Sequence, residues 1–328
     1  MSLLCCRNRR RSLERDRTFA APGAKPVVSG RTTTRAARRA HAYRRSTTEP
    51  PTLRALANGP EPSVQDYAEG SPSPPLAAHV LCWSVHRIDA RSGSYLHRSA
   101  PNGSVELVCE VGGQPLLVGP QTGPLIRTLS PGATIVSLRL RPESAAAVLG
   151  LPAYELADQI VPLDDVLPAT RFLCERIATE PKRAVATLEE AVSAQLARRA
   201  ATDRTVAFAV QRLTARATRV SSVAASMFVS ERQLRRRFKA AVGLQPKTLE
   251  RVLRFQRFLA LVHTGGWSRL GLARTAIALG YADQAHLTRE CVYLSGVPPA
   301  ALIRQTDIHC RGRHDHSPSF RALLGGTG

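Results

Sequence analysis

An approximate internal repeat constrains this chain more than any other feature of its sequence. The segment SERQLRRRFKAAVGLQP at 230–246 recurs in outline as DQAHLTRECVYLSGVPP at 283–299. Each copy opens on a helix-capping residue, Ser230 or Asp283, has leucine four residues later, and ends in glycine and proline after one long helix. The repeat predicts two helix-turn-helix units in one domain.

Positive charge is concentrated in one segment of the chain, as is typical of a module that binds polyanions. Residues 201–305 carry 17 Lys and Arg against 5 Asp and Glu, whereas residues 71–200 carry 12 of each class. Clustered positive charge attracts phosphates, so a basic segment beside a neutral one indicates a nucleic-acid partner. The partner predicted for 201–305 is double-stranded DNA.

Four motifs follow one another between residues 204 and 304: VAASMFVSERQLRRRF, GLQPKTLERVLRFQRFL, ARTAIALGYADQAHLTRE and SGVPPAAL. In this order they resemble the DNA-binding domain of AraC-type (AraC/XylS) bacterial transcription regulators. The resemblance implies an all-α domain whose recognition helices, at 230–242 and 283–294, enter the major groove. Two positions depart from the family pattern: Phe228 stands where the first turn usually has glycine, and Cys291 replaces a usual phenylalanine.

Helical periodicity separates buried from outward positions in both recognition helices. The predicted core stripes are Leu234, Phe238 and Val242 in the first, and Leu287, Cys291 and Leu294 in the second. By the resemblance, the outward positions contact DNA; they are Arg232, Arg235, Arg236 and Lys239, then Gln284, Ala285, Thr288 and Arg289. Arginine can bond guanine O6 and N7 or a phosphate, and glutamine can bond adenine N6 and N7. The alternative is a merely solvated basic face.

The segment between the two copies predicts a rigid spacer. Pro246 suits the first turn of a helix that continues to about Val262, which is roughly 25 Å long. Such a helix holds both recognition helices on one face of DNA, in major-groove segments ~34 Å apart. The site predicted for one chain is therefore asymmetric and about two turns long.

Residues 71–168 predict a small antiparallel β-sandwich or barrel-like domain with helices. The runs VLCWSVHRI, SVELVCEV, PLLVG and ATIVSLRLR are short, largely alternating and separated by Gly, Pro and Asn. Together with LRLRPESAAAVLGLPAYELADQIVPLDDV they resemble the first domain of one AraC-type subgroup, although Glu143 stands where glycine is expected. The resemblance implies sensing or dimerisation without indicating a ligand.

Four polar residues of this domain are candidates for a pocket, because charged groups inside a small β-fold need partners. They are His97, Glu106, Arg139 and Arg141. Surface salt bridges are the alternative. The following segment, 169–200, has apolar residues at helical spacing, interrupted near Pro181, and predicts a helical connector that packs on its own domain or supplies a dimer contact.

The two ends of the chain lack periodicity. Residues 1–70 are rich in Arg, Thr, Ala and Pro, which predicts a disordered basic arm or simply a tolerated extension, and residues 306–328 predict a disordered tail. His309, Cys310, His314 and His316 could bind a soft metal ion, but the surrounding composition favours the disordered tail, and no metal or cofactor is predicted. Scattered cysteines and the lack of a long apolar run indicate a cytoplasmic, nucleoid-associated protein.

The sequence as a whole predicts an α+β multidomain protein, not an enzyme, that regulates transcription by sequence-specific DNA binding. A small-molecule effector, RNA polymerase and a second copy of the chain remain open as partners. Two alternatives are kept: a non-specific nucleoid-type binder driven by the net charge of +21, and an enzyme in residues 76–200 fused to a DNA-targeting module.

Overall fold

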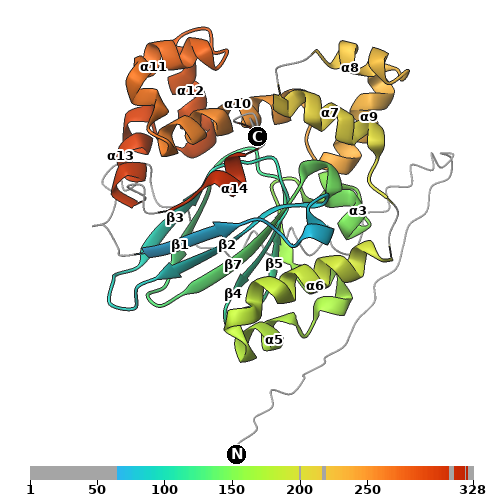
Figure 1. The fold of residues 1–328 in the computed structure, drawn as a ribbon, viewed down its shortest axis with the longest axis vertical. Helices are drawn as coiled ribbons and strands as arrows, with labels where there is room; N and C mark the ends of the chain where they lie inside the picture. The colour runs from blue at the N-terminus through green and yellow to red at the C-terminus, as the bar shows by residue number, and fades with distance from the viewer. Residues whose placement is uncertain (1–64, 199–200, 216–218, 310–313, 322, 324–328) are drawn as a thin grey trace, which may run out of the picture. The chain divides into compact units, whose positions relative to one another are not determined.

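The computed structural model describes residues 65–198, 201–215, 219–309, 314–321 and 323 (Figure 1). All of them fall within one compact unit of the chain. An antiparallel β-rich domain comes first and helices follow, so the fold is α+β with an all-α C-terminal part, as the sequence predicts. Over the described residues, no helix combines the length and the apolar character that crossing a bilayer requires.

The β-rich domain contains two antiparallel sheets. The strands are β1 (Gln65–Gly70), β2 (Val80–Ile88), β3 (Tyr95–Ser99), β4 (Glu106–Glu110), β5 (Leu116–Val118), β6 (Leu125–Leu129), β7 (Thr134–Leu140) and β8 (Ile160–Pro162). Six strands form one sheet in the order β1-β2-β7-β4-β5-β8, and β3 pairs with β6 in a separate sheet. The runs that predict strands in the sequence give β2, β4, β5 and β7.

The larger sheet has one apolar face and one polar face. Leu107 on β4 and Leu138 on β7 lie directly opposite each other and are fully buried on the apolar face. That face packs against helices, since Leu188 and Val192 belong to the same cluster. On the polar face, Arg139 of β7 lies opposite Glu106 of β4. The period of two in a strand thus separates a packed core from a polar surface.

Helices cover the apolar face and lead towards the C-terminal part. They are α3 (Ala145–Leu149), α4 (Leu163–Val166), α5 (Leu173–Thr179) and α6 (Ala184–Leu196), with short 3-10 turns at Pro74–Leu76, Pro142–Ser144, Ala153–Leu156, Pro168–Thr170 and Pro181–Arg183. Figure 1 shows α5 and α6 beside the strands of the larger sheet. Within the periodic segment, α5 and α6 therefore form a helical pair that is interrupted at Pro181 and packs on its own domain.

In the C-terminal part, every regular element among the described residues is a helix. Its helices are α7 (Arg204–Ala215), α8 (Val220–Ser226), α9 (Glu231–Val242), α10 (Pro246–His263), α11 (Gly266–Ala278), α12 (Gln284–Ser295) and α13 (Pro299–His309). Helices α8 and α9 form one helix-turn-helix unit, and α11 and α12 form the other. Figure 1 shows α10 running between the two units. One apolar cluster surrounds Phe238 and another surrounds Phe258, and α10 contributes to both.

The structure corrects the predicted disordered ends at two places. Residues 65–70, assigned by the sequence to the disordered arm, form strand β1 at the edge of the larger sheet. In the predicted tail, α13 continues to His309 and residues 317–320 form a short helix, α14 (Ser317–Phe320), in which Phe320 is buried. A single aromatic anchor has no periodicity, so composition alone does not reveal it. Residues 1–64 lie outside the described residues.

Candidate nucleic-acid interface

Helix α9 begins with a complete capping box. The Ser230 hydroxyl accepts a hydrogen bond from the backbone amide of Gln233 (3.2 Å), and the Gln233 side chain accepts one from the amide of Ser230 (3.0 Å). These bonds satisfy two amides that a helix start would otherwise leave unpaired. The N-terminal end of the first recognition helix is therefore well fixed.

The two sides of α9 differ as the periodicity predicts. Leu234, Phe238 and Val242 are all buried in the first unit. On the outer side, Arg232, Arg235, Arg236 and Lys239 are all exposed to solvent. Arg235 donates a hydrogen bond to Glu231 (2.8 Å) one turn earlier, while the Lys239 ammonium lies 5.4 Å from the ring centre of Tyr154 in the β-rich domain. Lys239 thus lies at the side of α9 that adjoins the β-rich domain.

One arginine of α9 has a structural role. The Arg237 guanidinium donates two hydrogen bonds of 2.7 Å to the carboxylate of Asp203, which joins α9 to the start of α7. Burial raises the pKa of Asp203, but its bonds with Arg237 and with backbone amides outweigh this effect and hold the pKa below its usual range. The periodicity excludes Arg237 from the outward set, but nothing in the sequence identifies its partner.

Helix α12 repeats the design of α9 with different outward residues. The Asp283 carboxylate caps it by accepting a hydrogen bond from the amide of His286 (2.6 Å). The predicted core residues Leu287, Cys291 and Leu294 are all buried. Among the outward residues, Gln284, Ala285 and Arg289 are exposed, and Thr288 is half-buried with its hydroxyl donating to the carbonyl of Gln284 (2.9 Å).

A basic residue on α10 holds the second helix-turn-helix unit in place by contacting α12. The Arg251 guanidinium donates to the carboxylate of Glu290 on α12 (2.8 Å from Nη2) and lies 4.0 Å from the ring centre of Tyr293. The hydrogen bonds to Glu290 raise the pKa of Arg251. Arg251 and Arg237 therefore hold the recognition helices in place, and neither is a free DNA contact.

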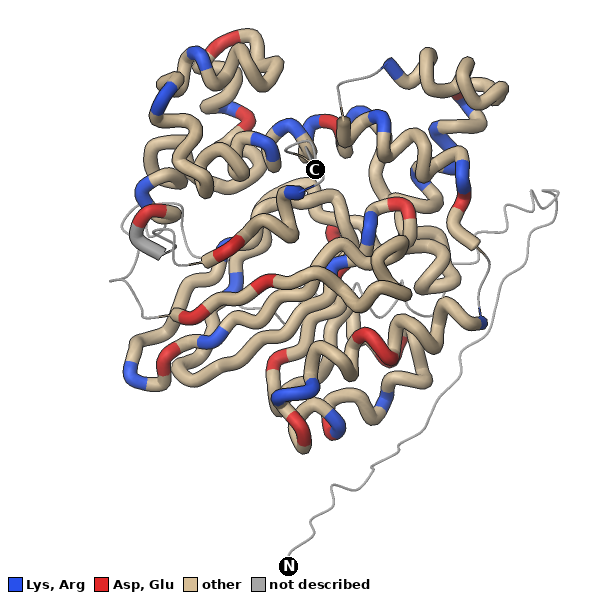
Figure 2. Tube along the Cα trace, viewed as in Figure 1, with Lys and Arg blue, Asp and Glu red and all other residues tan. Residues whose placement is uncertain are grey.

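Basic residues are spread over the helices of the C-terminal part, with few acidic ones among them (Figure 2). Helix α10 has 18 residues, one more than the sequence predicts, and is therefore roughly 27 Å long. The structure brings Arg232, Arg235 and Arg236 together on one exposed side of α9. It places Gln284, Ala285 and Arg289 on α12, in a separate unit.

The turns before the two recognition helices share one backbone geometry. In the first, the amide of Val229 bonds the carbonyl of Ala224 (3.1 Å), and Phe228 has a φ of 52°. In the second, the amide of Tyr281 bonds the carbonyl of Ala276 (2.9 Å), and Gly280 has a φ of 80°. Each turn thus ends the preceding helix with the same backbone hydrogen bond, from the amide that follows the left-handed residue to the carbonyl five residues earlier. Phe228 therefore occupies a left-handed position that its counterpart fills with glycine.

Replacing Phe228 with glycine is expected to stabilise the protein by about 1 kcal/mol. The left-handed backbone costs a residue with a Cβ about 1–2 kcal/mol, and the greater freedom of glycine in the unfolded chain offsets part of that gain. No packing is lost, because the Phe228 side chain is 97% exposed. Urea unfolding measures the effect. Phe228→Ala is the matched control, since it removes the ring but keeps the Cβ; equal stability of the two variants would contradict the prediction.

Three of the four candidate pocket residues lie together inside the β-rich domain. His97, Glu106 and Arg139 line one cavity, in which the Arg139 guanidinium donates to the Glu106 carboxylate (2.7 Å). Arg141 lies elsewhere and donates to the backbone carbonyl of Ala77 (2.8 Å). Among the described residues, no group of three or more His, Cys, Asp and Glu side chains is arranged to hold a metal ion.

Comparisons with known proteins agree with this division of the chain. Residues 223–305 match a family model described as a helix-turn-helix domain, and residues 68–162 match a domain of unknown function, DUF6597. No curated protein matches the chain.

Solved structures of ToxT from Vibrio cholerae O395 are similar to part of the chain. One shares 10% identity and covers 75% of this chain and 98% of its own, with a TM-score of 0.34. Another, bound to (E)-4-(8-methylnaphthalen-1-yl)but-3-enoic acid, shares 9% identity and covers 74% and 99%, with a TM-score of 0.36.

Proposed function

We propose that this chain, which carries an AraC-type double helix-turn-helix domain behind a DUF6597 domain, regulates transcription by reading two successive major-groove segments of DNA. The observation that carries the proposal is the placement of α9 and α12. Both are capped helices with a buried stripe and an exposed polar side, and one helix, α10, connects their units.

The dimensions of the helical part suit this way of binding. Helix α10 is roughly 27 Å long, and successive major-groove segments on one face of DNA lie ~34 Å apart. Arginine and glutamine are the side chains best suited to paired hydrogen bonds with guanine and adenine. We therefore assign base contacts to Arg235 and Gln284, and base or phosphate contacts to Arg232, Arg236, Thr288 and Arg289.

The β-rich domain is proposed to modulate DNA binding, because it contacts the recognition unit of α12 directly. The Arg98 guanidinium of β3 donates to the carbonyl of Ser295, the last residue of α12 (2.7 Å). The Gln256 side chain of α10 donates to the carbonyl of Pro101 (2.6 Å) in a buried bond. A molecule that favours one arrangement of these contacts would shift the DNA affinity by its differential binding.

A non-specific nucleoid-type binder is the second candidate, and the net charge of +21 favours it. Such a protein binds through phosphates alone, so its affinity falls steeply with salt and differs little among sequences. The exposed, acid-poor surface of the C-terminal helices serves either function. Only the base preference separates the two candidates.

Selection of binding sites by the full-length chain from a random duplex library, at near-physiological salt, tests the proposal. We expect one asymmetric site with two boxes whose centres lie about one helical turn apart. Tight, salt-sensitive binding without enrichment of any sequence would reject the regulator mechanism and support the non-specific binder.

A further inference from the structure

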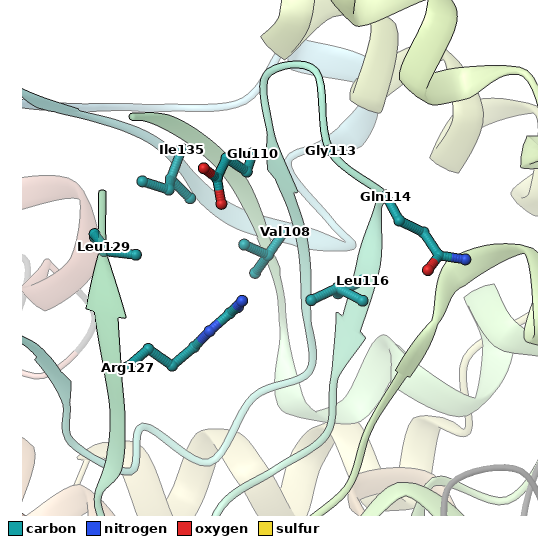
Figure 3. Close-up of a pocket in the computed structure, with 8 residues that line it drawn as sticks. All are labelled: Val108, Glu110, Gly113, Gln114, Leu116, Arg127, Leu129 and Ile135. Carbon is teal, nitrogen blue, oxygen red and sulfur yellow. The ribbon is translucent and has the colours of Figure 1, made fainter. Parts of the chain in front are cut away.

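Phe228 is the most exposed large apolar side chain among the described residues. It lies in the turn between α8 and α9 and is 97% exposed, whereas the next in order, Ile277, is 60% exposed. Apolar side chains inside the molecule are buried even where they border a hollow. Leu116 and Leu129, for example, line one of about 160 Å³ together with Arg127 (Figure 3), and both are buried. The turn of the first unit, in contrast, presents a whole phenyl ring to solvent.

The ring of Phe228 lacks the partners that other exposed rings have. Each of the other exposed aromatic side chains in the described part of the chain lies against a cation of the protein. The pairs, with the distance from the cationic group to the ring centre, are Arg171 with Phe172 (4.6 Å), Lys239 with Tyr154 (5.4 Å) and Arg251 with Tyr293 (4.0 Å). Such contacts stabilise an exposed ring. For Phe228, no ring contact and no cation at such a distance occur among the described residues.

The backbone of Phe228 is strained as well. Its φ of 52° lies in the left-handed region, which is unfavourable for a residue with a Cβ and above all for a bulky one. The equivalent position in the second unit is Gly280, whose φ of 80° carries no such cost. The Phe228 amide is fixed by its hydrogen bond to the carbonyl of Ala225 (3.1 Å). A strained residue that stabilises nothing within its own fold indicates a function outside it.

The position of the turn determines what the ring can meet. Phe228 comes two residues before the capping Ser230 and four residues before Arg232. In a helix-turn-helix unit bound to DNA, the N-terminal residues of the recognition helix contact base edges in the major groove, and the preceding helix crosses the backbone. The turn that joins these two helices therefore lies at the border of the groove.

The charge around the turn indicates a polyanionic partner. Residues 219–243 carry six basic side chains and one acidic side chain. The acidic residue, Glu231, is already paired with Arg235 (2.8 Å). Residues 220–230, which contain the turn, carry no charge of their own. The ring is thus an apolar group within a surface that attracts phosphates.

We infer that the Phe228 ring packs against the C5-methyl group of a thymine at the edge of the DNA box that α9 reads. The thymine methyl is an apolar group that DNA presents in the major groove, and phenylalanine is among the side chains that contact it. This contact removes apolar surface of both partners from water and so offsets the strain of the turn.

Phe228 thus adds an apolar base contact to the polar contacts assigned to α9. The second unit has no side chain at the equivalent Gly280, so the contact distinguishes the first box from the second. The inference rests on the proposed function, because it assigns one further base to the site that the regulator reads.

Replacement of single thymines by deoxyuracil tests the inference, since uracil lacks only the C5-methyl group and pairs with adenine in the same way. The full-length chain is titrated with the duplex that it selects, in which each thymine is replaced in turn. We expect one position, beside the first box, at which the replacement weakens binding of the parent chain about fourfold. Phe228→Ala should be insensitive to that replacement. It should bind the thymine duplex about four- to thirtyfold more weakly than the parent chain does.

Three further variants separate a DNA contact from an effect on folding. Phe228→Gly is expected to be more stable than the parent chain, so a loss of affinity in this variant cannot arise from unfolding. Phe228→Tyr keeps the ring and should keep the sensitivity to uracil. Phe172→Ala removes an exposed ring from the start of α5, away from the recognition helices in sequence, and should bind the selected duplex as the parent chain does.

The possible outcomes distinguish this inference from the proposed function. Equal sensitivity of the parent chain and Phe228→Ala to every uracil replacement would overturn the inference. A selected site without a thymine beside the first box would do the same, as would a loss of affinity in Phe228→Ala that is uniform over all duplexes. In each of these cases a selected site with two boxes still supports the regulator. Selection of no sequence by the parent chain would instead reject the proposed function, and the thymine contact with it.

Discussion

Replacing Arg235 with alanine is expected to weaken binding to the selected duplex about ten- to a hundredfold and to relax base preference in one box only. Arg235 is exposed on the outer side of α9, and its present partner, Glu231, is an exposed residue whose ion pair contributes at most about 1 kcal/mol. Breaking the ion pair with Glu231 so that Arg235 can bind a guanine therefore costs little free energy. Gln284→Ala should act in the same way on the other box, because α12 belongs to a separate apolar cluster.

Equilibrium binding of both variants to duplexes altered in one box at a time measures this effect. Arg87→Ala on the β-rich domain is a suitable control, because it removes an equal charge far from both recognition helices in sequence. Replacing an arginine that contacts a base should leave the salt dependence of binding nearly unchanged. Losing a phosphate contact should instead reduce the slope of log affinity against log salt concentration by about one. If Arg235→Ala lowered affinity for all duplexes alike, Arg235 would be a phosphate contact and the assigned base contact would be wrong.

Local sequence pattern was sufficient for the parts of the fold that depend on neighbouring residues. The capping residues Ser230 and Asp283 and the buried Leu234 and Leu287 follow from helical periodicity, because a helix is closed by bonds a few residues apart. The same reasoning predicted four of the six strands of the larger sheet, β2, β4, β5 and β7, from alternation and turn residues. The pocket candidates follow from one rule, that charged groups inside a β-fold have partners. Glu106 and Arg139 form such an ion pair.

Contacts between residues far apart in the chain were beyond that reasoning. Arg237 and Asp203 pair across two helices, and Ser319 bonds Glu69 from the other end of the described chain. Neither pair leaves a periodic signal, since its geometry depends on how whole elements pack. For the same reason, the sequence marks Arg127 only as one charge in a neutral domain. Its place between two sheets becomes evident once strand order and register are known.

Replacing Gly243 with alanine is expected to destabilise the protein by roughly 2–5 kcal/mol, the largest loss of stability that we predict. Gly243 ends α9 with a φ of 87°, a conformation that costs other residues about 1–2 kcal/mol. A Cβ there would lie 2.6 Å from Pro120 Cγ and 2.8 Å from the carbonyl oxygen of Ala153. Two elements of the β-rich domain would have to move, and overpacking of this kind adds about 1–3 kcal/mol.

Gly280→Ala is a close match for this substitution, because Gly280 has a φ of 80° but no atom within 4 Å of the position a Cβ would take. It should lose only the backbone contribution, so the difference between the two variants in urea unfolding isolates the contact between α9 and the β-rich domain. Gly296, at the end of α12, also faces the β-rich domain, but its near neighbour is the flexible end of a side chain, with Arg98 Nη1 3.1 Å from such a Cβ. The β-rich domain thus abuts the ends of both recognition helices. Equal losses for Gly243→Ala and Gly280→Ala would show that the contact between α9 and the β-rich domain contributes nothing to stability in solution, which would leave only the contacts with α10 and α12 to support modulation of DNA binding by that domain.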